Sequence, residues 1–369
     1  MVTLVVVDHH HSDYVDRAKV DLPTFGSEEE FISALHLHLS RDYDLVLSDA
    51  DPDGYLSALV YCLNRQSTNA NFKCFRVPLT KDHIEILKKN NIHTIIAFDW
   101  FPLYGSDLSL FDKVTLLNPV YSRLFENTST SELVYRASAH KTPFMRDLNA
   151  IGVVSDYGMK SGMNTVVETI QAYPELFTNL KIIATENKLN RTNVFDSRFK
   201  ELSELFWAPY IIYGEQGAQE LVRLILSSRA FTYDELFDFA HHPAIEYLWT
   251  SWHDFNRMME TERRNYDLFR EETGDIIIYT PQVTNPGFIQ KFSSVVSDHS
   301  SGKIILMKIS VGNKTKYSAR QKGLLIDLGR IFHDMGVGGG HATAAGALVD
   351  DPELFERQFM QRISRESAT

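Results

Sequence analysis

Short apolar runs alternate with longer amphipathic stretches from the start of the chain to about residue 160. This alternation is typical of a parallel β-sheet covered by helices. The sequence therefore predicts an α/β fold with a parallel sheet in this part of the chain. The expected strands span residues 2–7, 44–48, 72–77, 94–98 and 113–117.

The pattern changes at two later points. From residue 161 to residue 273 helical periodicity replaces the strand pattern, and residues 243–272 form a long stretch without internal Gly or Pro. After Gly274 the α/β rhythm returns, with expected strands at 275–279, 302–310 and 314–320, a hairpin turn at Gly312-Asn313, and helices at 326–335 and from Pro352. We therefore predict a parallel-sheet domain (1–160), a helical linker domain (161–273) and a smaller α/β domain (274–369).

Composition narrows the class of protein. The 369 residues are 44% apolar, so the chain can bury a large core, and no apolar run approaches the roughly 18 residues that span a bilayer. Two cysteines, Cys62 and Cys74, suit a reducing compartment, so we expect a soluble cytoplasmic protein without a membrane partner. The formal charge of -11 argues against electrostatic binding of duplex nucleic acid over a broad basic surface. A short or single-stranded phosphate substrate is compatible with this charge.

Acidic residues follow the second expected strand. Asp49, Asp51 and Asp53 stand within five residues, directly after the apolar run 45–47. Like charges at this separation cannot all ionise cheaply unless a cation lies among them, and Gly54 allows a tight backbone turn. We favour a divalent metal site over the alternative, a turn rich in Asx residues.

Two further aspartates stand in comparable positions. Asp99 follows the apolar run 95–98, and Asp156 follows Val153-Val154-Ser155. A helix cap is the alternative role for each. In open α/β sheets ligands collect at the carboxyl ends of strands, so Asp8, Asp49, Asp99 and Asn118 are candidates for one crevice. With Asp156 and the first cluster, the aspartates supply enough carboxylates for a pair of Mn²⁺ or Mg²⁺ ions.

The first expected strand ends in Asp8-His9-His10-His11. A chance cluster is the alternative, but the strand-end position matches that of the other candidates, and we favour a ligand role. Imidazole added to oxygen ligands favours Mn²⁺ over Mg²⁺.

A glycine motif near the end of the chain is a candidate anion site. Gly338, Gly339 and Gly340 precede His341, so backbone N–H groups could approach a phosphate closely; a flexible loop is the alternative. Upstream, Arg320 ends an expected strand and offers planar bidentate donors that suit phosphate.

An aromatic stripe lies on the long expected helix. Trp249, Trp252, Phe255 and Met259 follow one another at helical spacing. We predict the buried face of the helix rather than a base-stacking surface.

Together these motifs resemble those of the DHH phosphoesterases that carry the DHH-associated C-terminal domain, a family that includes RecJ-like exonucleases and nanoRNases. The segment Asp49-Ala50-Asp51-Pro52-Asp53-Gly54 matches the first family motif, Asp99 the second and Asp156 the fourth. Ser318-Ala319-Arg320 and the segment 338–346 match the substrate-binding lobe. The helical middle of the chain is unmatched.

One departure from the family pattern concerns the Asp-His-His triplet. In the family it follows the second motif, where this chain reads Leu117-Asn118-Pro119-Val120, whereas Asp8-His9-His10 stands near the start. Either the N-terminal strand delivers a transposed triplet to the same metal site, or the site has lost its histidines. We favour transposition.

The resemblance implies phosphodiester hydrolysis at a two-metal centre that holds Mn²⁺, with Mg²⁺ as the alternative. Asp99 would bridge the ions, and His10 would contact the phosphate or act as an acid. The other implied metal ligands are Asp49, Asp51, Asp53, Asp156 and His9, and the implied substrate-binding residues are Arg320, Gly338, Gly339, Gly340 and His341. The implied substrate is single-stranded DNA or a short oligonucleotide. The alternatives are an oligoribonuclease, a cyclic-dinucleotide phosphodiesterase and a non-catalytic RecJ-like scaffold.

Overall fold

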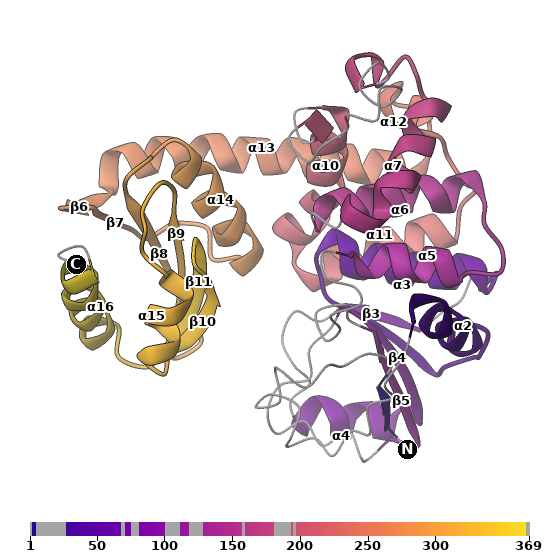
Figure 1. Cartoon of the computed structure of the whole chain (residues 1–369), viewed down its shortest axis with the longest axis horizontal. Helices are drawn as coiled ribbons and strands as arrows, with labels where there is room; N and C mark the ends of the chain where they lie inside the picture. Colours follow the sequence, from indigo (N-terminus) through magenta and orange to yellow (C-terminus); the bar gives the residue numbers. More distant parts are fainter. Residues whose placement is uncertain are drawn as a thin grey trace. The chain divides into compact units, whose positions relative to one another are not determined.

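The computed structural model divides into two compact units, Met1–Trp252 and His253–Thr369, which are described separately (Figure 1). The residues that the structure describes are 2–4, 27–67, 71–74, 81–99, 111–117, 128–156, 159–180, 193–194 and 197–366. Asp8, His9, His10 and Asn118 lie outside these ranges.

The first unit is built on a five-stranded parallel sheet with strand order β1-β5-β4-β2-β3. Its strands are β1 (Val2–Leu4), β2 (Leu45–Ser48), β3 (Phe72–Cys74), β4 (Thr94–Phe98) and β5 (Lys113–Leu117). Each lies within a range expected from the apolar runs, so the predicted parallel sheet is confirmed.

Both faces of this sheet are covered, which explains why its strands are almost continuously apolar. On one face, Ile84 and Leu87 of α4 (Lys81–Lys89) form a core cluster with strand residues such as Leu45 and Ile95. On the other face α3 (Pro52–Asn64) contacts β2 and β4, and the ring of Tyr61 lies 5.5 Å from that of Phe98.

Further helices complete this unit, and some contact α3 directly whereas others pack on those neighbours (Figure 1). They are α2 (Glu28–Leu39), α5 (Thr130–Ala137), α6 (Pro143–Ser155), α7 (Met159–Ala172), α10 (Arg198–Tyr213), α11 (Glu215–Leu226) and α12 (Tyr233–Phe237). Because α10 contacts α3 and α6, and α11 contacts α3 and β3, this helical segment belongs to the same compact unit as the sheet. The boundary between units falls at residues 252/253, and the domain limits 160/161 and 273/274 stay predictions.

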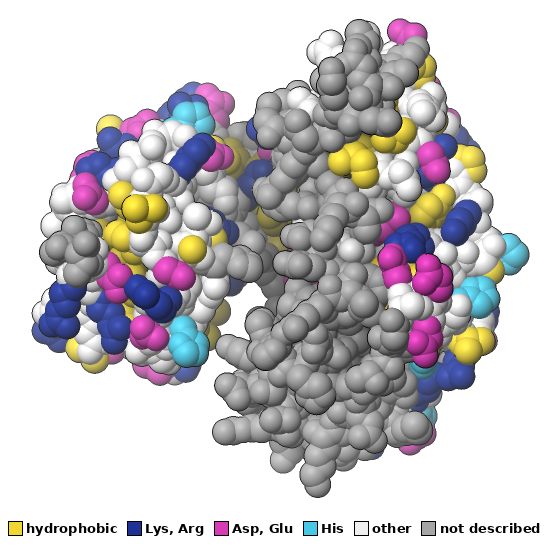
Figure 2. Space-filling model, viewed as in Figure 1, with side chains coloured by type: hydrophobic (Ala, Val, Ile, Leu, Met, Phe, Trp, Pro, Cys, Tyr) yellow, Lys and Arg dark blue, Asp and Glu magenta, His cyan; other side chains and the backbone are white. Residues whose placement is uncertain are grey.

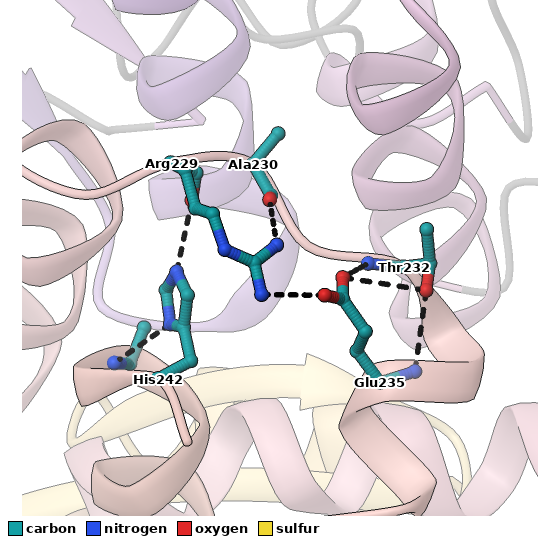
Figure 3. Close-up of polar contacts among 6 residues, drawn as sticks. Arg229, Ala230, Thr232, Glu235 and His242 are labelled. Carbon is teal, nitrogen blue, oxygen red and sulfur yellow. Dashed lines mark hydrogen bonds and ion pairs between the residues drawn. The ribbon is translucent and has the colours of Figure 1, made fainter. Parts of the chain in front are cut away.

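The corner before the long helix α13 (Pro243–Phe269) is fixed by local hydrogen bonds (Figure 3). Thr232 and Glu235 form a reciprocal capping box, and Arg229 pairs with the Glu235 carboxylate. The ring of His242, 2% exposed, accepts a hydrogen bond at Nδ1 from the N–H of Ala244 (3.2 Å). Its Nε2 therefore carries the proton and donates it to the carbonyl of Arg229 (2.9 Å).

The aromatic stripe lies on α13. Trp249 and Phe255 are 8% and 2% exposed, and the indole N–H of Trp249 donates to the carbonyl of Leu236. These two residues are buried, as predicted for the inner face of the helix, whereas Trp252 and Met259 are partly exposed.

The second unit holds a six-stranded sheet with order β10-β11-β9-β8-β7-β6. Its strands are β6 (Glu271–Thr273), β7 (Ile276–Tyr279), β8 (Ile304–Val311), β9 (Lys314–Gln321), β10 (Gly338–His341) and β11 (Ala344–Val349). Helices α15 (Leu328–Asp334) and α16 (Pro352–Glu366) form a core cluster with β7, β8, β9 and β11, and α14 (Pro286–Asp298) contacts β8 and β9. The expected β7, β8 and β9 are confirmed, whereas β6, β10 and β11 were not anticipated.

Candidate metal centre

The two strands β2 and β4 are neighbours and end at the same level. Ser48, the last residue of β2, is paired with Phe98, the last residue of β4. The N–H of Asp49 then donates to the carbonyl of Phe98 (3.1 Å), and the N–H of Asp99 donates to that of Leu117 (2.8 Å). The sheet therefore places Asp49 and Asp99 side by side at its carboxyl edge, where ligands collect in α/β folds.

Three of the predicted carboxylates meet at this edge. Asp49, Asp51 and Asp99 each offer an oxygen, and these oxygens lie within 4.8 Å of one another. Asp51 is also the N-cap of α3, accepting a hydrogen bond from the N–H of Gly54 (3.0 Å). A Cβ at Gly54 would lie 2.8 Å from the carbonyl oxygen of Asp49, so only glycine lets the helix start this close to the acidic turn.

Asp53 is buried (1% exposed) and anchored by helix α5. Its Oδ2 accepts a hydrogen bond from the N–H of Thr130 (2.8 Å) and its Oδ1 one from the N–H of Ser131 (3.0 Å). Burial, opposed by these bonds and reinforced by the charge of Asp51, raises the pKa of Asp53 to about 7. Asp53 is not among the three carboxylates that meet, and its predicted ligand role stays a prediction.

Asp99 adopts a left-handed backbone conformation (φ 53°), which is uncommon for a residue other than glycine. Its Oδ1 accepts a hydrogen bond from the hydroxyl of Thr130 (3.0 Å). Burial, followed by the charge of Asp51 and those of three other aspartates, raises the pKa of Asp99 well above its usual value.

Asp156 belongs to the same electrostatic group. It stands at the C-cap position of α6, where its backbone N–H donates to the carbonyl of Gly152. Desolvation and the charges of Asp53 and Asp51 raise the pKa of its carboxyl to about 9. The five predicted aspartates therefore act on one another electrostatically, although only three supply oxygens within 4.8 Å.

The residues present fit a divalent cation. Carboxyls that hold their protons near neutral pH because they are buried and lie close to other carboxylates would release those protons to a cation. A set of carboxylate oxygens suits Mg²⁺ or Mn²⁺. Within the described residues this group contains no imidazole, and His9 and His10 lie outside those residues, so their role stays a prediction.

The first turn of α5 is a part of the site that the sequence analysis did not identify. Ser129 caps the helix by accepting a hydrogen bond from the N–H of Glu132 (3.2 Å), so the capping pattern Ser-x-x-Glu gave a signal for the helix start. Gly152 of α6 allows the close packing here, because a Cβ would lie 2.3 Å from Ser131 Oγ and 3.2 Å from Asp53 Oδ1.

In the second unit, the strand register relates the predicted phosphate-binding residues. Ala344 of β11 is paired with Arg320 of β9 on one side and with His341 of β10 on the other, so the three positions form one row across the sheet. The Nε of Arg320 donates to Ser294 Oγ of α14 (3.2 Å). On the face drawn in Figure 2, Lys and Arg lie among Asp and Glu over the described surface of this unit.

The glycine motif is a strand, not the flexible loop considered as an alternative. A Cβ at Gly338 would lie 1.9 Å from the carbonyl oxygen of Gly346, and one at Gly340 would lie 2.3 Å from that of Ala344. A Cβ at Gly339 would meet nothing within 4 Å. Hairpin packing therefore requires two of the three glycines, whether or not an anion binds.

Comparison with solved structures identifies the fold. RecJ in complex with Mn²⁺ from Thermus thermophilus superimposes with a TM-score of 0.64 and 14% identity, covering 100% of this chain and 62% of that protein. Exonuclease RecJ bound to manganese superimposes with a TM-score of 0.58 and 16% identity, covering 92% of this chain and 94% of that protein. The DHH domain of a member of the s1p family of ribosomal proteins superimposes with a TM-score of 0.54 and 13% identity, covering 98% of this chain and 93% of that domain.

The chain therefore has the DHH fold, which confirms the fold that the motifs implied. No protein-family model matches the sequence, and no curated protein matches it. The chain spans 62% of the length of Thermus RecJ. Among the described residues, no helix combines the length and the apolar character that a bilayer crossing requires.

Proposed function

We propose that this protein is a Mn²⁺-dependent phosphodiesterase that hydrolyses single-stranded DNA or short oligonucleotides. The observation that carries the proposal is the meeting of Asp49, Asp51 and Asp99 at the carboxyl edge of the parallel sheet. The DHH fold supports it, because the RecJ structures of this fold are described as bound to manganese.

In this proposal Asp49, Asp51 and Asp99 would hold the cations, and Asp53, Asp156 and His9 would complete the set of ligands. Strand β1 is parallel to β5, which pairs with β4, so the chain leaves β1 toward the same edge of the sheet as Asp99. This direction supports a role for His9, which follows Leu4 by five residues.

Bound divalent cations would supply Lewis-acid stabilisation of phosphate charge and an acidified water. The chain would supply the fixed geometry: the strand ends and α3 hold Asp49, Asp51 and Asp99, and α5 holds Asp53. His10 would contact the phosphate or donate a proton. In the second unit, Arg320 and the glycine strand with His341 would bind substrate phosphate.

The test is hydrolysis of end-labelled substrates with Mn²⁺, Mg²⁺ or EDTA. The panel contains a long single-stranded DNA, RNA of two to five nucleotides and a cyclic dinucleotide. We expect Asp51→Ala to lower the rate by about 10³-fold or more, since it removes a metal ligand. Asp42→Ala is the matched control, because Asp42 is 91% exposed and pairs with Arg65 on the surface.

Each outcome separates one function from the others. Degradation of the long strand supports the exonuclease, and cleavage restricted to short RNA or the cyclic substrate indicates the corresponding phosphodiesterase. If no substrate turns over with any metal and Asp51→Ala behaves as Asp42→Ala, the enzyme proposal is wrong and the scaffold alternative stands.

A further inference from the structure

One buried threonine touches two of the candidate metal-site carboxylates. Thr130, fully buried, is the first residue of α5. Its backbone N–H donates to Oδ2 of Asp53 (2.8 Å), and its hydroxyl donates to Oδ1 of Asp99 (3.0 Å). Asp53 comes from α3 and Asp99 from the end of β4, so a single residue links the two segments that carry the site.

The hydrogen bond from the Thr130 hydroxyl restricts the side chain of Asp99, whose backbone conformation is itself unfavourable. The left-handed conformation of Asp99 (φ 53°) persists only where the surroundings hold it. Its N–H is held by the carbonyl of Leu117 and its carboxylate by Thr130. The bond to Oδ1 therefore restricts the orientation of the carboxylate, and the second carboxylate oxygen takes no part in it.

We propose that the hydroxyl of Thr130 is a positioning group that orients the Asp99 carboxylate for divalent-cation binding. This inference rests on the proposed function, since it requires that the carboxylate group binds a cation. Groups that hydrogen-bond a metal ligand from behind fix its orientation, and their loss typically weakens metal binding about 10- to 100-fold. Thr130 is not a ligand, and its contribution passes through Asp99.

The alternative is that Thr130 only begins the helix and fills space. Two substitutions separate the roles, because both keep the backbone N–H that holds Asp53. Thr130→Val keeps the branched shape and removes the hydroxyl, whereas Thr130→Ser keeps the hydroxyl and removes a methyl group. Thr169→Val is the matched control, because Thr169 is also fully buried and its hydroxyl has no hydrogen-bond partner among the described residues.

The experiment is a calorimetric titration of each full-length variant with Mn²⁺ alone, together with the thermal midpoint of each metal-free protein. We expect Thr130→Val to raise the Kd about 10- to 100-fold, and Thr130→Ser and Thr169→Val to bind as the wild type does. If Thr130→Val does not fold, Thr130→Ala takes its place in the same titration.

Two results would overturn the inference while leaving the proposed function intact. One is a folded Thr130→Val protein with the affinity of the wild type, and the other is a Thr130→Ser protein that binds as weakly as Thr130→Val. A wild-type protein that binds no Mn²⁺ is a different result, because it refutes the proposed metal site and this inference together.

Discussion

The close packing of α6 on α5 gives the sharpest test of the site's architecture. A Cβ at position 152 would lie 2.3 Å from Ser131 Oγ and 2.8 Å from Ser131 Cβ, which is closer than real Cβ contacts. Overpacking of a buried site costs about 1–3 kcal/mol, and a contact this short belongs at the upper end. Alanine is favoured over glycine within a helix by about 1 kcal/mol. We therefore expect Gly152→Ala to destabilise the first unit by about 2 kcal/mol.

The clash at position 152 would involve Ser131, so a double-mutant cycle can test whether this residue causes the loss of stability. Ser131→Gly removes both the Oγ and the Cβ that Gly152→Ala would meet, and the nearest remaining contact is Asp53 Oδ1 at 3.2 Å. In the Ser131→Gly background we expect Gly152→Ala to be neutral or stabilising. The two substitutions should therefore show a coupling energy of about 2–3 kcal/mol.

Urea unfolding followed by tryptophan fluorescence is the appropriate assay. The chain has four tryptophans, and the three that the structure describes, Trp207, Trp249 and Trp252, belong to the first unit, so their emission reports on its unfolding. The reasoning is refuted if Gly152→Ala is as stable as the wild type. It is also refuted if the loss is the same with and without Ser131, because the clash would then not involve α5.

Three further outcomes are expected. Because burial raises the pKa of Asp53 to about 7, above that of a free carboxyl, the metal-free protein binds more protons when folded than when unfolded. Its free energy of unfolding should therefore fall as pH rises from about 4 to 7, and its Mn²⁺ affinity should rise across pH 7 in calorimetric titrations. Gly338→Ala should speed amide hydrogen exchange in the β10–β11 hairpin, whereas Gly339→Ala should not, since only the first meets backbone at 1.9 Å. His242→Ala should lower the free energy of unfolding in urea by about 1–3 kcal/mol through the loss of two buried hydrogen bonds, and His242→Asn should partly restore the bond from the N–H of Ala244.

The sequence predicted the parallel sheet well because its strands are buried on both faces and therefore read as apolar runs. It also indicated Asp49, Asp51 and Asp99, because strand-end position and charge are local properties that can be read along the chain. The first turn of α5 was missed for the opposite reason. Thr130 acquires its contacts with Asp53 and Asp99 only through tertiary packing, across 77 and 31 residues of sequence.

The glycine motif illustrates a different limit. Three successive glycines carry neither the apolar alternation nor the β-branched residues that identify strands, so β10 had no strand signal. The structure shows that Gly338 and Gly340 approach the backbone of β11 too closely for any side chain. A pattern that favoured an anion site is thus also explained by hairpin packing, and the sequence alone could not separate the two.

The continuity of α13 decides how the protein can be divided for biochemical work. The two units meet at residues 252/253, within a helix that runs without interruption from Pro243 to Phe269. A cut there would leave Trp249 in the last turn of one fragment and Phe255 in the first turn of the other, where helix ends fray, and both side chains are buried in the intact chain. Fragments intended to fold alone should each retain the whole of α13. In each fragment, polar residues should replace those apolar side chains of α13 that pack only in the other fragment.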